Sequence, residues 1–545
     1  MFHGWRARSH HLTRNRRFLI RASVSIVVAG FTIGCLVQWL RVGATSADVR
    51  ARQVSPTAQK LRESWRRLET AGDPAPRELL GWLARFFKSQ DDLAEELGTP
   101  PLELDPYLKS GKLFAFDVRA MIVRHVKENR EHRLFEDFVT AMLGVRDDRG
   151  EAATGRLRHA AAAEPPAPFA NEMLARMLLA RDQDADVLGA LVREGGFDDA
   201  ALARDDALHL AIERHEAELL AGLMRLPKWR ESATPWMRGR IGALTGDVWM
   251  QWRGIIAHQM ASMRWGLLAL ALFAAGLWYV ILAQRSDDQT WRWFRPALPV
   301  VAGVCSVWPA LILLTYQEYH LGFVEHAPFP RNIWYFIAGV GLREELSKLA
   351  LFAVFLPWLL WRRSEGAALL AAAFVGLGFA LEENINYYRG GGGIAWLRFL
   401  TANFMHVAMT GITGHALYEM LRWRFARAEK FVAAFLLIVM AHGFYDCADE
   451  IDEVLNIGLG RFLPLIILIL LAGHFFDLLA ATTRPDAGIV SPAAVLLIGS
   501  ALLIAVMFVV AGATTADLGG IAAVGNECVS VAPVIFVYWR KFEVR

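Results

Sequence analysis

Long apolar runs divide the chain into segments of very different character. The first 21 residues are basic and contain no acidic residue, and an apolar run over 22–40 follows them. The other apolar runs lie after residue 264, at 265–283, 297–315, 333–358, 367–388, 396–420, 431–447, 462–481, 490–512 and 519–539. A helix needs about 20 mainly apolar residues to cross a bilayer. The pattern therefore predicts about ten membrane spans, each near that length.

The segment 42–264 has the opposite composition. Apolar residues recur there at three- and four-residue spacing among many charged helix formers, which is typical of amphipathic helices. Short proline-containing stretches separate these helices, and no alternation typical of strands is present. We expect a compact α-helical domain in this part of the chain.

Basic residues in the connections between runs give an orientation. Those on one side are Arg285, Arg292, Arg295, Arg362, Arg363, Arg422, Arg424, Arg427, Lys430, Arg484, Arg540, Lys541 and Arg545. Because cytoplasmic loops are enriched in Lys and Arg, both termini are predicted inside and 42–264 outside. The expected fold is all-α: a polytopic transmembrane helix bundle in the cell (inner) membrane with one extracytoplasmic α-helical domain.

This organisation divides the chain into five predicted parts. They are a cytoplasmic N-terminus with the first span (1–41), the extracytoplasmic domain (42–264), the second and third spans (265–332), a polar-residue-containing core (333–447) and the C-terminal spans (448–545).

Composition narrows the class of protein. The chain is 54% hydrophobic, which excludes a disordered protein, and 58 Lys+Arg against 55 Asp+Glu give no overall field for nucleic acid. We expect no nucleic-acid partner. Only four cysteines are present and none forms a CxxC pair, which excludes a disulfide scaffold.

Ionisable residues interrupt four of the apolar runs between 333 and 447. They are Glu344, Glu345, Lys348, Glu383, His406, His442 and Asp446. Such residues are costly inside a bilayer and mark functional sites. Glu344 and Lys348 share a helix face at i,i+4, as do His442 and Asp446. Two histidines and several carboxylates on neighbouring helices could hold a metal ion, activate a water, or relay protons.

Four motifs in these runs resemble the PrsW-type membrane proteases, which belong with the CAAX-processing and bacteriocin-processing intramembrane proteases. EELSK (344–348) is similar to the family's EExxK, GFALEEN (378–384) to its GFAxxEN, and HGFYD (442–446) to its HGxYD. Arg398, eight residues before His406, is similar to the family's spaced Arg and His. The motifs occur in the family's order over about a fifth of the chain.

The resemblance implies hydrolysis of a peptide bond in a membrane-bound substrate, such as a single-span regulator or an anti-sigma factor. Glu344 or Glu345 would activate the water and Lys348 would stabilise their helix electrostatically. The remaining residues would position the water, a metal or the tetrahedral oxyanion. They are Glu383, His406, His442 and Asp446, which are also the candidate ligands of a divalent metal such as zinc. A metal-free Glu/His mechanism fits the residues equally well.

Two other functions remain open at this point. A transporter or proton-coupled channel could use the same buried Glu/His/Asp cluster, and a membrane signalling protein could keep a protease-like core without activity. Other protease chemistries lack their motifs, since neither HExxH nor GxSxG occurs. Glu382 is interpreted as a structural neighbour of Glu383 rather than a member of the site. His415 and Glu419 are interpreted as interfacial residues near the inner end of their span.

Overall fold

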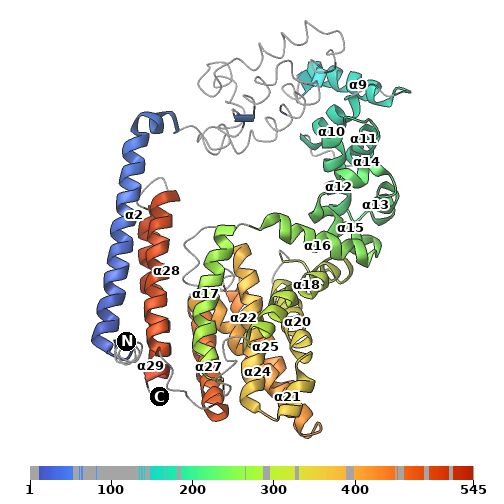
Figure 1. The fold of residues 1–545 in the computed structure, drawn as a ribbon. Helices are drawn as coiled ribbons and strands as arrows, with labels where there is room; N and C mark the ends of the chain where they lie inside the picture. The colour runs from blue at the N-terminus through green and yellow to red at the C-terminus, as the bar shows by residue number, and fades with distance from the viewer. Residues whose placement is uncertain are drawn as a thin grey trace. The chain divides into compact units, whose positions relative to one another are not determined.

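A computed structural model of the chain describes residues 12–52, 148–165, 169–180, 186–263, 265–286, 295–325, 330–387, 398–448, 459–483, 490–514 and 519–543. Isolated positions between 61 and 141, and residues 167 and 451, are also described. All regular structure in these residues is helical (Figure 1). The expectation of an all-α protein is therefore confirmed for the described part of the chain.

The chain divides into two compact units. Unit 1 comprises Met1–Ala44 and Ile255–Arg545, and unit 2 comprises Thr45–Gly254. Unit 2 lies within the range 42–264 expected for the helical domain. Its described helices are α9 (Asp148–Ala162), α10 (Ala170–Ala180), α11 (Val187–Glu194), α12 (Ala201–Glu213), α13 (Ala217–Leu223), α14 (Pro227–Ser232), α15 (Pro235–Thr245) and the first part of α16 (Val248–Ser262).

Local sequence explains where the helices of unit 2 begin and end, as α15 illustrates. Pro235 occupies its first turn, and the Thr234 hydroxyl accepts a hydrogen bond from the Met237 amide at 3.3 Å. Proline and an N-terminal threonine both suit the first turn, where backbone amides lack partners within the helix. Gly246 ends α15 in the left-handed conformation, with φ of 74°.

Unit 1 is a bundle of long apolar helices. They are α2 (Arg16–Arg52), α17 (Trp265–Ala283), α18 (Ala297–His320), α22 (Glu365–Tyr387), α24 (Ala402–Arg422), α25 (Ala428–Asp446), α27 (Leu459–Thr482), α28 (Pro492–Thr514) and α29 (Gly519–Glu543). Between α18 and α22 the chain forms four shorter pieces: α19 (Arg331–Trp334), the π-helix η4 (Tyr335–Gly341), α20 (Leu342–Ala353) and α21 (Leu356–Arg362).

Among the described residues, 7 helices are long and apolar enough to cross a membrane, or 8 if the bent pair Gly519–Val529 and Pro533–Phe542 forms one span. This supports a multi-pass membrane protein but does not confirm the expected number of spans. The runs 333–358 and 396–420 account for the difference. The first is divided among short helices, and α24 in the second carries several polar residues. The span count and the side on which unit 2 lies stay predictions.

Glycines allow two close helix contacts that shape the core of unit 1. A Cβ atom added at Gly376 on α22 would lie 2.1 Å from the His406 carbonyl oxygen on α24. One added at Gly443 on α25 would lie 2.6 Å from Ile337 Cα in η4. Small residues let backbones approach this closely in membrane bundles. The contacts therefore set α24 against α22 and α25 against the segment that leads into α20.

The helices α22 and α24 are antiparallel, and one end of the pair is rich in arginine. There, Arg422 Nη1 at the end of α24 lies 2.7 Å from Glu365 Oε1 at the start of α22. We call this the basic end. Glu383 lies 18 residues further along α22, which corresponds to about 27 Å at the rise of an α-helix. The motif residues therefore lie toward the opposite end of the pair.

Candidate active site

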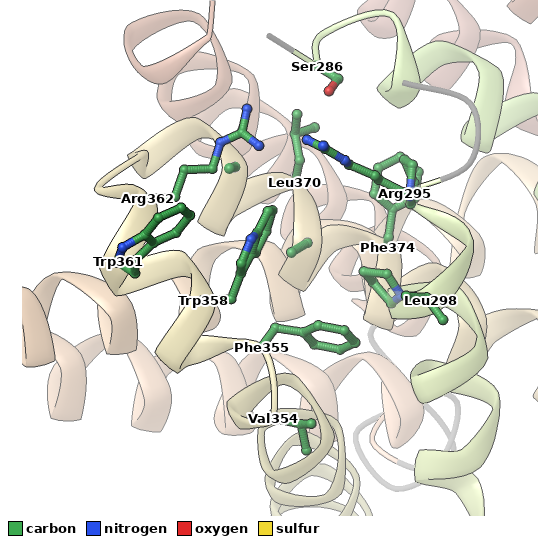
Figure 2. Close-up of a pocket in the computed structure, with 14 residues that line it drawn as sticks. Ser286, Arg295, Leu298, Val354, Phe355, Trp358, Trp361, Arg362, Leu370 and Phe374 are labelled. Carbon is green, nitrogen blue, oxygen red and sulfur yellow. The ribbon is translucent and has the colours of Figure 1, made fainter. Parts of the chain in front are cut away.

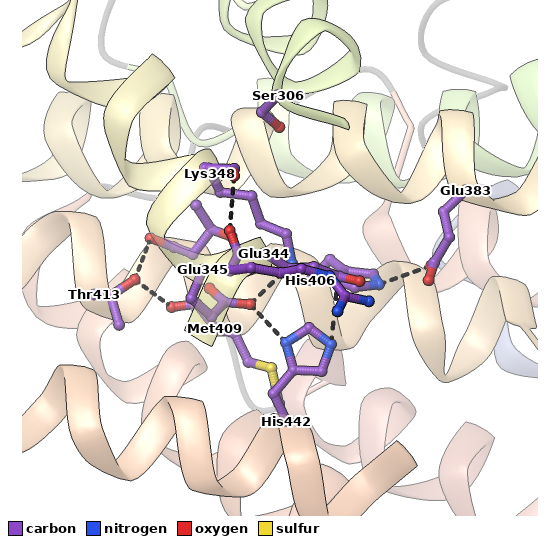
Figure 3. Close-up of polar contacts among 12 residues, drawn as sticks. Ser306, Glu344, Glu345, Lys348, Glu383, His406, Met409, Thr413 and His442 are labelled. Carbon is purple, nitrogen blue, oxygen red and sulfur yellow. Dashed lines mark hydrogen bonds and ion pairs between the residues drawn. The ribbon is translucent and has the colours of Figure 1, made fainter. Parts of the chain in front are cut away.

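The structure brings all four motif-bearing helices together around one polar cluster (Figure 3). Helix α20 supplies Glu344, Glu345 and Lys348, and α22 supplies Glu383. Helix α24 supplies His406, and α25 supplies His442 and Asp446. Contacts link all seven side chains into one network.

Lys348 lies at the centre of this network and is fully buried. Its Nζ is 2.9 Å from Glu345 Oε1, 2.8 Å from His406 Nδ1 and 3.6 Å from Glu344 Oε2. An ammonium group can only donate hydrogen bonds. His406 Nδ1 therefore accepts, and the proton on its Nε2 is donated to Glu383 Oε2 at 3.0 Å. Lys348 thus sets the tautomer of His406 as well as neutralising a glutamate.

His442 is held by Glu345 in a similar way. His442 Nδ1 donates to Glu345 Oε1 at 2.9 Å. Its Nε2 faces two other carboxylates, at 3.5 Å from Glu344 Oε2 and 3.4 Å from Asp446 Oδ2. A carboxylate that binds one imidazole nitrogen fixes the ring and leaves the other nitrogen available for chemistry. Glu345 itself is completely buried and has no contact with the site's cavity.

Glu383 is held by a second chain of polar contacts. Arg398 Nη2 donates to Glu383 Oε2 at 2.7 Å, and Arg398 Nε donates to Asn384 Oδ1 at 2.6 Å. Asn384 Nδ2 in turn donates to Asn403 Oδ1 at 2.5 Å. Sequence reasoning did not single out Asn403. Asn403 lies three residues before His406, on the same face of α24, and this spacing is the signal that could have identified it.

A cavity of ≈ 100 Å³ borders the cluster, between α16, α18, α20 and α22. Glu344, Glu383 and Glu382 line it, and apolar residues of α18 close its other side. Glu382, interpreted as structural, accepts a hydrogen bond from Gln259 of α16 within this wall. A polar cavity of this size has room for water. Glu344 is thus the residue of the glutamate pair that borders the water-sized space.

The cluster also suits a divalent metal ion. Donor atoms of Glu344, His406 and His442 all lie within 4.8 Å of one another. Glu344 Oε2 is buried and accepts no hydrogen bond. One glutamate and two histidines are a donor set of catalytic zinc sites. Both nitrogens of His406 have partners, so binding through His406 requires one of those partners to be replaced.

The balance of charged side chains in the cluster also favours a bound metal ion. Four carboxylates (Glu344, Glu345, Glu383 and Asp446) share two basic side chains (Lys348 and Arg398). A deficit of positive charge in a buried cluster favours a bound cation or protonated histidines.

The metal group differs in membership from the one expected from the sequence. Glu383 and Asp446, expected as ligands together with the two histidines, lie outside this compact group, and each contacts one of its histidines: Glu383 contacts His406 and Asp446 contacts His442. Asp446 lies at the same nitrogen, His442 Nε2, that faces Glu344, so both stay predicted ligands. Glu344, expected as a candidate base, completes the compact group.

A second group with metal-ligand spacing lies at the basic end, where Glu365, His415 and Glu419 have donor atoms within 4.8 Å of one another. Here each carboxylate has its own arginine. Arg422 pairs with Glu365 and Arg427 pairs with Glu419.

Buried carboxylates beside two histidines and a cavity with room for water, in a bundle of apolar helices, are groups that can activate a water molecule or move a proton. Comparison with known protein families narrows the class of protein to which this site points. Residues 265–474 match the family model described as PrsW family intramembrane metalloprotease. The match confirms the resemblance inferred from the four motifs and supports a membrane protease domain in this part of the chain. Neither the curated proteins nor the solved structures gave a match to the chain.

Proposed function

We propose that the protein is an integral-membrane endopeptidase of the PrsW type that hydrolyses a peptide bond in a membrane-bound substrate. Glutamate-activated water is the nucleophile. The observation that carries this proposal is the position of Glu344. Its buried Oε2 accepts no hydrogen bond, lies 3.5 Å from His442 Nε2, and belongs to a residue that borders the cavity.

Glu344 and Glu345 have different roles in this proposal. Glu344 is the general base, because it borders the space that a water can occupy. Glu345 is a positioning residue, because its Oε1 binds both Lys348 Nζ and His442 Nδ1 and the side chain is wholly buried. A base must reach the proton that it removes within hydrogen-bond distance. Among the described residues, Glu345 is within hydrogen-bond distance of Lys348 and His442 only, and it does not border the cavity that a water can occupy.

The other side chains of the cluster transfer the proton and hold the charged groups in place. Glu344 takes a proton from the attacking water and passes it to His442 Nε2, which lies 3.5 Å from Glu344 Oε2, and His442 gives this proton to the leaving amine as the C–N bond breaks. Lys348 neutralises Glu345 and holds His406 through Nδ1, and is therefore a positioning residue like Glu345. Arg398 and His406 hold Glu383 at the edge of the cavity.

Glu344, His406 and His442 would hold a divalent metal such as zinc. When bound, such an ion polarises the scissile carbonyl and acidifies a water. The role of Glu345 is the same with or without it, because Glu345 orients His442 through Nδ1 and leaves Nε2 available.

The substrate is proposed to be a membrane protein with a single span, such as an anti-sigma factor or a similar regulator. Residues 42–264 are proposed to lie outside the inner membrane and to recruit or gate this substrate. The basis for their placement is the distribution of Lys and Arg among the connections.

A comparison of membrane proteomes tests the proposed activity. A deletion strain, the wild type and strains with Glu344→Gln, Glu345→Gln or His442→Ala are compared for single-span proteins that accumulate. We expect the same proteins to accumulate in the deletion strain and in all three variant strains at normal levels of the variant protein. Wild-type processing in all three variant strains would contradict the proposal. Glu419→Gln is the matched control, because it removes a paired carboxylate at the basic end.

A transporter function has one observation in its favour. Transporters bind ions where membrane helices are interrupted, and the run 333–358 is divided among η4, α20 and α21 next to the polar cluster. Ion or proton flux into proteoliposomes that is lost in Glu345→Gln, without any cleavage by the wild type, would support transport instead of proteolysis.

A further inference from the structure

A second and larger cavity of ≈ 510 Å³ lies between α18, α21 and α22 (Figure 2). None of the residues of the candidate active site lines it. Its volume falls within the range of small-molecule and cofactor sites, about 300–1,000 Å³. The peptidase chemistry proposed above does not use it.

The polar residues of this cavity gather at one end. Figure 2 shows Ser286, Arg295 and Arg362 on the same side, with the side chain of Arg295 directed toward the space between them. All three lie where membrane helices begin or end. Ser286 follows α17, Arg295 precedes α18, and Arg362 is the last residue of α21. Helix ends with arginines are typical of the membrane interface.

Apolar and aromatic side chains form the rest of the cavity. Phe355 and Val354 lie at the end away from the two arginines, with Trp358 and Phe374 between (Figure 2). Several large apolar residues of the lining are well exposed on unit 1: Trp361 is 81%, Val354 70% and Leu298 68% exposed. In a membrane protein, large exposed apolar side chains face lipid. The cavity thus has a basic end at the interface and an apolar part whose lining includes side chains that face the bilayer.

The two arginines suit a phosphate group. A guanidinium binds phosphate through paired N–H donors. Arg362 also lies over the Trp358 ring, with its Cζ 5.4 Å from the ring centroid, which orients it along the cavity wall. Basic pockets between transmembrane helices bind anionic lipid headgroups.

We propose that this cavity binds one anionic phospholipid, with the headgroup phosphate between Arg295 and Arg362 and an acyl chain along Trp358, Phe355 and Phe374. The positive end of the cavity selects the charge of the headgroup. The apolar part adds affinity that a soluble phosphate ester lacks, because burial of acyl methylenes is favourable. This proposal does not depend on the proteolytic activity.

Native mass spectrometry of the delipidated full-length protein in detergent tests the proposal. Phosphatidylglycerol and phosphatidylcholine with identical acyl chains are titrated against the wild type and against the double variant Arg295→Gln/Arg362→Gln. We expect one phosphatidylglycerol to bind the wild type at least about tenfold more tightly than phosphatidylcholine, which corresponds to about 1.4 kcal/mol. The double variant should lose this preference. The matched control is Arg363→Gln/Arg424→Gln, which removes two arginines that do not line the cavity.

Two further arms make the result decisive. Ala367→Phe fills the cavity while keeping both arginines and should weaken binding of phosphatidylglycerol. Excess glycerol phosphate, which has the headgroup chemistry without chains, should not displace the bound lipid. Equal binding of both lipids by the wild type, an unchanged preference in the arginine double variant, or unchanged binding of phosphatidylglycerol in Ala367→Phe would overturn the proposal. Displacement by glycerol phosphate would show a phosphate site without a lipid and would also overturn it.

Discussion

Helix α24 contributes a histidine to each of two His–carboxylate groups, one toward each of its ends. The active-site group (Glu344, His406 and His442) and the basic-end group (Glu365, His415 and Glu419) have the same donor types and the same compact spacing. Each also contains a buried atom without a hydrogen bond, Glu344 Oε2 in one and His415 Nε2 in the other. Spacing and an orphaned polar atom therefore do not distinguish a reactive site from a structural one.

Charge balance does distinguish them. At the basic end, two carboxylates have two arginines, and the Glu365 and Arg422 side chains are 37% and 32% exposed. In the active-site cluster, four carboxylates share Lys348 and Arg398, and Lys348 and Glu345 are completely buried. Pairs neutralised one by one at a helix end stabilise the end of the bundle. A buried cluster with excess negative charge retains groups that can take up a proton or a cation.

The largest expected effect separates the two groups by activity. Glu344→Gln and His442→Ala should each lower cleavage of a membrane substrate by about 10²–10⁴-fold, the contribution of a positioned acid or base. Glu365→Gln and Glu419→Gln should leave the rate essentially unchanged. The measurement is cleavage of a tagged single-span substrate by purified protein in liposomes. Equal losses at the two ends would show that the charge comparison is wrong.

Metal content gives the next test. We expect elemental analysis of the purified protein to find one divalent metal per chain, lost in His442→Ala and kept in His415→Ala. The reason is that a cation balances the excess carboxylates of the active-site cluster, whereas the basic-end carboxylates already have arginines. Loss of metal in His415→Ala alone would place the metal at the basic end. A protein that is free of metal and fully active would support the metal-free Glu/His mechanism.

Stability should differ between the groups as well. Lys348→Ala leaves Glu345 buried without its ammonium partner, which should cost about 3–5 kcal/mol. Arg427→Gln removes a partly exposed partner of Glu419 and should cost at most about 1 kcal/mol. Unfolding of both variants in the same detergent, measured by denaturant titration, checks the difference. A loss in Arg427→Gln as large as that in Lys348→Ala would contradict it.

Sequence analysis anticipated which residues meet in the active-site cluster but not how they pair. Residues at i,i+4, such as His442 and Asp446, share a face in any α-helix, so their contact was predictable. The hydrogen bond between Glu345 and His442 joins two residues that are 97 positions apart in the chain. It forms where α25 packs closely against η4 at Gly443. No spacing rule gives such a contact. For the same reason, spacing alone could not separate the roles of Glu344 and Glu345.

The sequence predicted the kind of secondary structure better than the bounds of the individual helices. The apolar runs predicted all-helical, membrane-spanning structure, which the helices of unit 1 support. The run 333–358 was expected to form a single span, but it contains a π-helix followed by two short helices. The π-helix packs closely against α25, where Gly443 meets Ile337, and π-helical turns are rare in proteins. The hydropathy of the run 333–358 does not show where a helix changes from α to π.

The close contact between α22 and α24 at Gly376 should have a smaller effect than the loss of Lys348. Gly376→Ala would place a methyl group against the His406 carbonyl, and overpacking of this kind costs about 1–3 kcal/mol. Gly473→Ala on α27 is the matched control, because no atom lies within 4 Å of the added Cβ. We expect thermal unfolding in detergent to show a loss for Gly376→Ala and no loss for Gly473→Ala. Equal stability of both variants would show that α22 and α24 can separate without cost.

The most direct test of the central claim is isotope incorporation during cleavage. Purified protein in liposomes is incubated in H₂¹⁸O with a single-span protein that accumulates in the deletion strain, and the products are analysed by mass spectrometry. The account predicts a new C-terminal carboxylate with one ¹⁸O atom for the wild type and for Glu419→Gln, and no product for Glu344→Gln. Product formation by Glu344→Gln at the wild-type rate, or no product from the wild type, would contradict it.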